Sequence, residues 1–101
     1  AYLAGQIAND TTQNIVGQTR EVLGMVGALL QEAGTDKSHI LMAHIYLSNM
    51  LDYDGMNEAW DEWVKDIKGH APPRATVQSP LAGSEFLVEI VVTAAVGATT
   101  K

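Results

Sequence analysis

The stretch ILMAHIYL, residues 40–47, says most about the architecture, because an extended chain with this sequence is apolar on both faces. One face would carry Leu41, Ala43, Ile45 and Leu47, and the other would carry Ile40, Met42, His44 and Tyr46. A strand that is buried on both sides lies in the middle of a sheet with something packed on each face. The sequence therefore predicts a central strand over residues 40–47.

A helix is predicted before this strand, because apolar side chains recur at helical spacing over residues 15–33. Gly34 follows the last of them and is expected to end the helix in a left-handed turn. The helix contains three glycines, Gly17, Gly24 and Gly27, which make it less stable than alanine would. We expect these glycines to let the helix backbone pack closely against a neighbouring element.

A second helix is predicted from the apolar residues at 53, 56, 60, 63, 64 and 67, which again fit a period of 3.6. Asp52 or Asp54 would cap its start. Gly69 and the Pro72-Pro73 pair would end it. The acidic residues around it are expected to form a solvated helix face; they are Asp52, Asp54, Glu58, Asp61 and Glu62.

Three further strands are expected, over residues 2–7, 74–79 and 86–96. The order strand, helix, strand, helix, strand, strand is typical of an α+β sandwich with two helices on one face of a sheet. The other sheet face is also apolar, and two helices cannot cover both faces. Identical subunits are the simplest candidates to cover it.

The bulk composition limits the possible functions. A chain of 101 residues forms one domain, here residues 1–101. Its formal net charge of −6 and its lack of a basic cluster argue against nucleic-acid partners. The absence of cysteine excludes disulfides and thiolate chemistry. No apolar run is long enough to span a membrane, and the first residues do not resemble a signal peptide, so the cytoplasm is the expected location.

Arg74 opens the stretch RATVQ with Thr76 and Gln78 on the same expected strand face. Such an arginine either forms a structural ion pair at an exposed edge or holds an anion, because its guanidinium donates two parallel hydrogen bonds to a carboxylate. The pattern alone leaves both interpretations open.

Glu89 is a lone carboxylate in the otherwise apolar run FLVEIVV, residues 86–92. Burying it without a partner would be costly, so it must be paired, hydrogen-bonded or close to water. Arg74 is the nearest basic residue in the sequence and is expected on an adjoining strand. An ion pair between subunits is the structural alternative to a functional role.

Five segments, in order along the whole chain, resemble the RidA family, also called YjgF or endoribonuclease L-PSP-like. They are AGQIA, QTREVLGMVGALLQEAGTDKSHIL, IYLSNMLDYDGMNEAWDEW, PPRATVQSPLA and LVEIVVTAA. The resemblance implies a chorismate-mutase-like fold and a homotrimer with ligand clefts between subunits. It also implies hydrolysis of 2-imino acids to 2-keto acids and ammonia, with no metal and no cofactor. The sequence departs from the family pattern at Ala4, where serine is common. The family's first strand is also absent, as if a preceding segment were missing. These departures indicate a divergent subgroup.

The resemblance also implies roles for five residues. Arg74 would grip the substrate carboxylate, and the backbone N–H of Thr76 would serve the same group. Glu89 would position the attacking water. Asn57 and Gly5 would line the cleft.

The remaining candidates are less specific. His44 is expected to be a satisfied interior group, while His39 and His70 would face solvent, and no histidine pair has zinc spacing. Trp60 and Trp63 fit the buried stripe of the second helix. Two functions therefore remain: a trimeric 2-imino acid deaminase, or a trimeric carboxylate-binding or holdase-like protein without turnover. The family's ribonuclease label is a weak third, because the net charge is negative.

Overall fold

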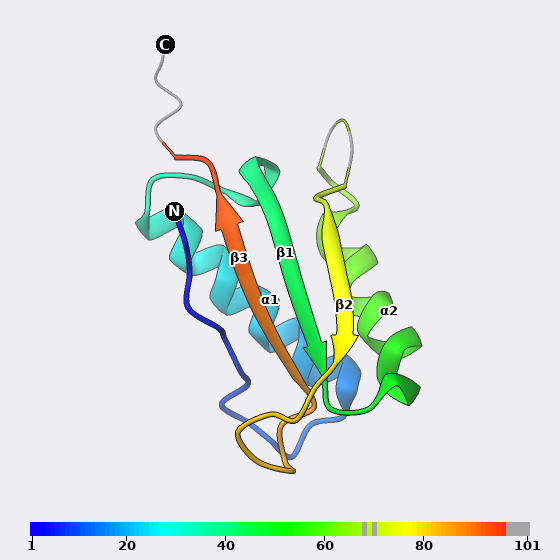
Figure 1. The fold of residues 1–101 in the computed structure, drawn as a ribbon. Coiled ribbons are helices and arrows are strands. Elements are labelled where there is room, and N and C mark those ends of the chain that lie inside the picture. Colours follow the sequence, from blue (N-terminus) through cyan, green and yellow to red (C-terminus); the bar gives the residue numbers. More distant parts are fainter. Residues whose placement is uncertain (68, 70, 97–101) are drawn as a thin grey trace.

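A computed structural model describes residues 1–67, 69 and 71–96. Two long helices lie behind a three-stranded sheet (Figure 1). In chain order the elements are α1 (Ile15–Glu32), η1 (Lys37–His39), β1 (Ile40–Leu47), η2 (Met50–Asp52), α2 (Tyr53–Val64), β2 (Arg74–Gln78) and β3 (Val88–Ala94). The predicted architecture, two helices on one face of a sheet, is confirmed, and the sheet is mixed.

β1 is the central strand, as its sequence predicts. The strand order is β2-β1-β3, with β1 parallel to β2 and antiparallel to β3. The parallel connection requires a crossover, and α2 supplies it. The loop between β2 and β3 then carries the chain past β1 to the opposite edge of the sheet (Figure 1).

The hydrophobic core lies between the sheet and the helices. Alternate residues of the two long strands are buried on this face: Ala43, Ile45 and Leu47 of β1, and Val88, Ile90, Val92 and Ala94 of β3. The helices contribute Val22, Leu23, Val26 and Leu30 of α1, and Met56 and Trp60 of α2. Removing such side chains from water is the main force that holds the helices on the sheet.

The opposite face of the sheet is not covered by either helix (Figure 1). Its side chains are half-buried or exposed: Met42, His44, Tyr46, Ala75, Val77, Glu89, Val91 and Thr93. Burial of β1 on both faces is therefore not met within one chain. His44 is exposed, because it points to this open face rather than into the core.

The start of β1 departs from simple alternation. The pairing with β3 shifts register between Ile40 and Met42. Ile40 is consequently 7% exposed and joins the core, whereas Leu41 is 58% exposed. The prediction that Leu41 shares the face of Ala43 is wrong, because an irregularity in one strand displaces the side chains on one side of it.

The first predicted strand, residues 2–7, is not a regular strand. This segment runs antiparallel along the outer edge of β3 through two isolated bridges, Tyr2 to Thr93 and Gln6 to Ile90. The Gln6 and Ile90 main chains exchange hydrogen bonds of 2.9 and 3.1 Å. The last strand is also shorter than the predicted range of 86–96: Val88–Ala94 forms the strand that pairs with β1.

Helix α1 matches its prediction closely. Asn14 caps its start by accepting a hydrogen bond from the Gly17 N–H, at 2.9 Å. Gly34 follows its end with a φ of 83°, the predicted left-handed conformation. The expected close packing at Gly24 is wrong, because a Cβ there would meet nothing within 4 Å. At Gly27 it would reach only the Trp63 ring, at 4.0 Å.

Helix α2 begins directly after Asp52, as predicted, but the Asp52 side chain makes no capping hydrogen bond. The short helix η2 runs straight into α2, and the Tyr53 N–H already bonds to the Met50 carbonyl. A side-chain cap is therefore not needed at this junction. The helix ends at Val64, before the predicted stop at Gly69. No helix in the described part of the chain is long and apolar enough to cross a membrane.

Candidate functional site

Arg74 is the first residue of β2 and pairs with Ala43 in the register of the sheet, so its side chain leaves on the helix-covered face. There it crosses to α2. Its Nη1 donates to the Met56 sulfur at 3.3 Å, and its Nη2 donates to the Asn57 side-chain oxygen. The guanidinium carbon lies 5.2 Å from the centroid of the Trp60 ring and 5.9 Å from that of Tyr53. Both distances are in the range of a cation–π contact.

The four residues that hold Arg74 come from one face of α2. Tyr53, Met56, Asn57 and Trp60 are spaced at i, i+3, i+4 and i+7, the spacing that aligns side chains on a helix. Trp60 is almost fully buried, as predicted for a core residue, but it also supports the arginine. Sequence reasoning missed this second role. The signal was present, because Asn57 is a polar residue on the otherwise apolar face of α2 that Arg74 contacts.

Arg74 has no carboxylate partner within the described residues. The ion pairs found there join Arg20 to Glu62, Lys37 to Asp66 and His39 to Asp36. A guanidinium carries five N–H donors, and here two of them meet a sulfur and a neutral amide oxygen. A partly buried positive charge held in this way retains donors for an anionic ligand.

Thr76 lies on the same face of β2 as Arg74, since it pairs with Ile45 two residues further along. β2 is an edge strand, and the Pro73 carbonyl and the Ser79 N–H both bond to β1, each at 2.9 Å. Peptide groups point alternately to the two sides of a strand, so the Thr76 N–H points away from β1 to the free edge. It is therefore a main-chain donor on the exposed side of the strand that carries Arg74.

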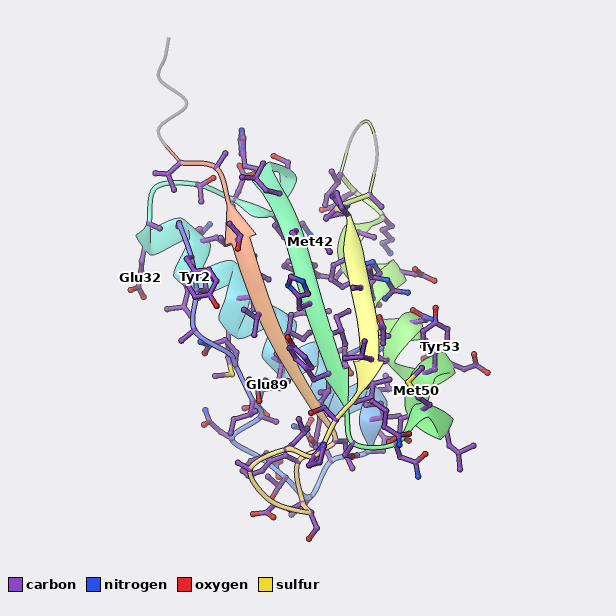
Figure 2. All side chains as sticks on the ribbon, in the orientation of Figure 1. Tyr2, Glu32, Met42, Met50, Tyr53 and Glu89 are labelled. Atoms are coloured by element: carbon purple, nitrogen blue, oxygen red, sulfur yellow. The ribbon has the colours of Figure 1, made fainter. Side chains whose placement is uncertain are left out.

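Glu89 lies on the opposite, open face of the sheet. It pairs with Tyr46 in the register of β1 and β3. Figure 2 shows it beside the N-terminal segment that follows the edge of β3. A Cβ added to Gly5 would lie 2.1 Å from the Glu89 Oε2 and 2.9 Å from its Cδ. The carboxylate therefore rests against a stretch of main chain that only glycine leaves open.

The expectation that Arg74 and Glu89 sit on adjoining strands is wrong. β1 separates their strands, and the two side chains leave the sheet on opposite faces. The structure instead brings the five predicted residues together in two groups. Arg74, Asn57 and Thr76 form one group at the β2 edge, which we call the arginine half-site. Glu89 and Gly5 form the other, the glutamate half-site.

The other candidates take structural positions. His39 is exposed, as expected, and its Nδ1 lies 3.0 Å from an Asp36 oxygen. His70 lies outside the described residues. Trp63 packs beside Trp60, with ring centroids 5.8 Å apart, and under the Lys37 ammonium at 5.1 Å. Within the described ranges, no group of three or more histidine or acidic side chains could hold a metal ion.

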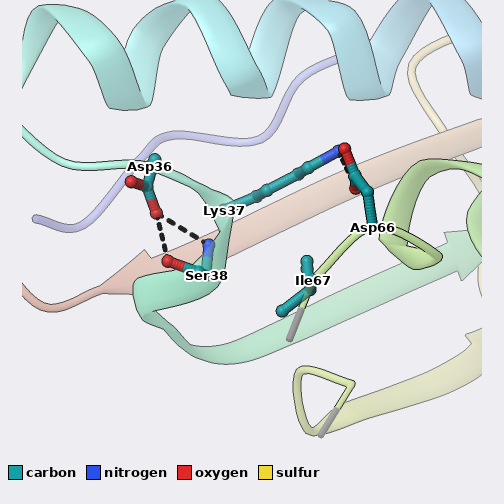
Figure 3. A pocket seen from close by; sticks show the side chains of 5 residues that line it. All are labelled: Asp36, Lys37, Ser38, Asp66 and Ile67. Atoms are coloured by element: carbon teal, nitrogen blue, oxygen red, sulfur yellow. Dashed lines mark hydrogen bonds and ion pairs between the residues drawn. The ribbon is translucent and has the colours of Figure 1, made fainter. Parts of the chain in front are cut away.

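A hollow of about 430 Å³ lies away from both half-sites, between η1 and the end of α2 (Figure 3). Its lining consists of Asp36, Lys37, Ser38, Asp66 and Ile67. The Lys37 ammonium crosses it to the Asp66 carboxylate, at 3.0 Å, and this hydrogen bond lowers the pKa of Asp66. Two Ser38 donors bond to Asp36 and lower the pKa of that carboxyl. Lys37 and Asp66 are thus paired with each other, and Asp36 already accepts hydrogen bonds from Ser38.

Comparison with known proteins identifies the family to which this chain belongs. Residues 1–96 match the family model described as Endoribonuclease L-PSP. The chain is 49% identical to a RutC family protein of Haemophilus ducreyi over 96 residues, which are 95% of this chain and 80% of the relative. It is 46% identical to the RutC family protein YoaB of Escherichia coli over 79 residues, which are 78% of this chain and 68% of the relative.

A solved structure is similar as well. A member of the YjgF protein family from Neisseria meningitidis superposes with a TM-score of 0.88 at 41% identity. The alignment covers 94% of this chain and 77% of that one. The layered arrangement of Figure 1 is therefore the YjgF/RidA fold.

Proposed function

The chain belongs to the Endoribonuclease L-PSP family, and from this premise we propose that it hydrolyses reactive 2-imino acids to 2-keto acids and ammonia. The observation that carries the proposal is the state of Arg74. Its guanidinium is fixed on a helix face without a carboxylate partner among the described residues. It is thus prepared for the carboxylate of a small ligand.

Each active cleft combines the two half-sites from different subunits. Within one chain the arginine and glutamate half-sites lie on opposite faces of the sheet and cannot act on one molecule. A second copy of the chain, packed on the open sheet face, can bring its own β2 edge to the Glu89 of the first. We propose a homotrimer closed in this way, because a cyclic arrangement uses the same two surfaces at every interface.

The chemistry assigns one step to each group. Arg74 and the Thr76 N–H hold the substrate carboxylate, which places the imine carbon in the cleft. Glu89 of the neighbouring subunit orients a water and accepts its proton as the oxygen bonds to that carbon. The C=N electron pair moves to nitrogen, and the proton that Glu89 accepted is passed to this nitrogen, which gives a carbon bearing a hydroxyl and an NH2 group. Glu89 then takes the hydroxyl proton and passes it to the NH2 group, so that the C–N bond breaks, ammonia leaves and the hydroxyl oxygen becomes the keto oxygen.

The alternative is a carboxylate-binding protein without turnover. It is favoured by the completeness of the arginine half-site, whose four supporting contacts all come from the same chain. Such a protein would need Arg74 but would not need Glu89. The two functions therefore make different demands on the glutamate half-site.

Assembly is tested first. Light scattering at micromolar concentration should report about three times the chain mass of 10.8 kDa. A monomer would contradict the proposed clefts, since each cleft needs two chains.

The function is tested with 2-iminopropanoate, generated in place by an amino-acid oxidase and trapped with semicarbazide. The parent protein should reduce the trapped fraction by hydrolysing the imine first. Glu89→Gln keeps the side-chain volume but removes the base, so turnover should fall about 10²- to 10⁴-fold while 2-keto acid binding changes little. An inactive parent that still binds 2-keto acids would support the binding protein. An active parent whose Glu89→Gln variant keeps the full rate would remove Glu89 from the mechanism.

A further inference from the structure

We infer that the natural ligand carries a sizeable apolar side chain, larger than a methyl group, and that Met50, Leu51 and Tyr53 receive it. This inference rests on the proposed function, because it assumes that Arg74 holds the ligand carboxylate. It adds a subsite for the remainder of the ligand. The subsite consists of Met50 and Leu51 of η2 and of Tyr53, the first residue of α2, and we call these three residues the apolar rim.

The apolar rim concentrates exposed hydrophobic surface. Met50 is 40% exposed, Leu51 is 89% exposed and Tyr53 is 38% exposed. Three large apolar side chains within four consecutive residues leave apolar area in water, which is unfavourable unless a ligand or partner covers it. Met50 and Tyr53 lie close together beside the lower end of β2 (Figure 2).

The apolar rim adjoins the arginine half-site through two contacts. The Tyr53 ring lies 5.9 Å from the guanidinium carbon of Arg74, so this residue touches both regions. The Met50 N–H donates to the Gln78 side-chain oxygen at 2.8 Å. Gln78 shares the β2 face of Arg74 and Thr76.

The arrangement along β2 sets the size of the ligand. The Thr76 N–H and the Gln78 contact to Met50 are two residues apart, about 7 Å along an extended strand. A ligand whose carboxylate lies on Arg74 and the Thr76 N–H therefore needs an aliphatic or aromatic side chain of several carbons to reach the apolar rim. A methyl group would leave the rim in water. The chemistry favoured is that of imino acids derived from leucine, methionine or phenylalanine.

The closing experiment compares two 2-keto acids by calorimetry, pyruvate and 4-methyl-2-oxopentanoate. The second has three more carbons in its side chain, and a fully buried methylene strengthens binding about fourfold. With partial burial at an open rim, we expect the larger acid to bind the parent about tenfold more tightly. In Met50→Ala and Leu51→Ala variants, the ratio of the two dissociation constants should fall about threefold or more.

Leu41→Ala is the matched control, because Leu41 is also an exposed leucine but lies at the opposite end of β1. The ratio of dissociation constants should be unchanged in this variant. Equal affinity for the two acids in the parent would overturn the inference, and so would an unchanged ratio in both rim variants. A loss of trimers in the rim variants, seen by light scattering with the ratio preserved, would assign the rim to subunit contact instead.

The turnover assay separates this inference from the proposed function. It is run with imines generated from alanine and from leucine. If neither imine is hydrolysed but the larger keto acid still binds more tightly, the apolar rim stands and the hydrolase fails. If both imines are hydrolysed at similar kcat/KM and the keto acids bind equally, the hydrolase stands and the inference fails.

Discussion

The two half-sites are built in different ways. Arg74 is held by side chains, all from one face of a single helix. Glu89 rests against main chain at Gly5, a residue 84 positions earlier, and its other surroundings are the open sheet face. The arginine half-site is thus complete within one chain, whereas the glutamate half-site has space that a neighbouring subunit would fill. Because the two half-sites are built separately, we expect substitutions in one to affect the proposed ligand binding and substitutions in the other to affect the proposed water activation.

Mixed trimers test the comparison most strongly. Arg74→Ala and Glu89→Gln trimers should each be nearly inactive. If each cleft takes its arginine and its glutamate from different chains, every trimer containing both variants has one intact cleft. Co-expressed chains with two different tags, purified through both tags, should recover roughly a third of the parental rate.

The control is a doubly tagged trimer in which every chain carries Arg74→Ala, which should stay inactive. Mixed trimers without recovered turnover would show that both groups act from one chain. The two half-sites would then have to be brought together by a rearrangement within the subunit.

The arginine half-site is tested alone by Arg74→Lys. An ammonium group keeps the charge but cannot reproduce the fork that binds a carboxylate through two parallel hydrogen bonds. The variant should therefore bind 2-keto acids about 2–5 kcal/mol more weakly, nearly as poorly as Arg74→Ala. Calorimetry measures the difference. Parental affinity in Arg74→Lys would mean that only a positive charge is required.

The glutamate half-site is tested by Gly5→Ala, because the added Cβ would collide with the Glu89 carboxylate at 2.1 Å. The end of this side chain can move, so the fold should survive. A displaced base should nevertheless lower turnover about 10- to 100-fold, with 2-keto acid affinity nearly unchanged. Gly24→Ala is the control, since open space surrounds that position, and its turnover should equal that of the parent.

The smallest expected effect concerns the support of the arginine. Asn57→Ala removes the amide oxygen that accepts from the Arg74 Nη2. A lost hydrogen bond to a charged group in a partly exposed site should weaken 2-keto acid binding about 3- to 10-fold. The rate at saturating substrate should stay close to the parental rate. A large fall in that rate with unchanged affinity would instead indicate that Asn57 acts together with Glu89 in turnover, rather than with Arg74 in binding.

Much of the fold can be predicted from local sequence patterns. In α1, apolar residues recur at helical spacing and Gly34 follows the end of the helix. In β1, apolar residues occupy both faces along the whole strand. Such patterns involve residues that are close in the sequence, so they can be recognised before the fold is known. The irregular pairing at Ile40 and Met42 and the two bridges of residues 2–7 depend on β3 instead. No local pattern carries that information.

The amino-acid sequence was enough to predict two helices, three of the four expected strands and two conspicuous charged groups, an arginine at the start of one strand and a lone glutamate in another. Both follow from residue type and spacing, which do not change on folding. The folded chain was needed to learn that β1 lies between those strands, that Arg74 turns to α2 and that Glu89 faces the open side. The sequence did not predict these features, because strand order is set by long-range hydrogen bonding and by the crossover through α2. The face of each side chain then follows from the register of that pairing.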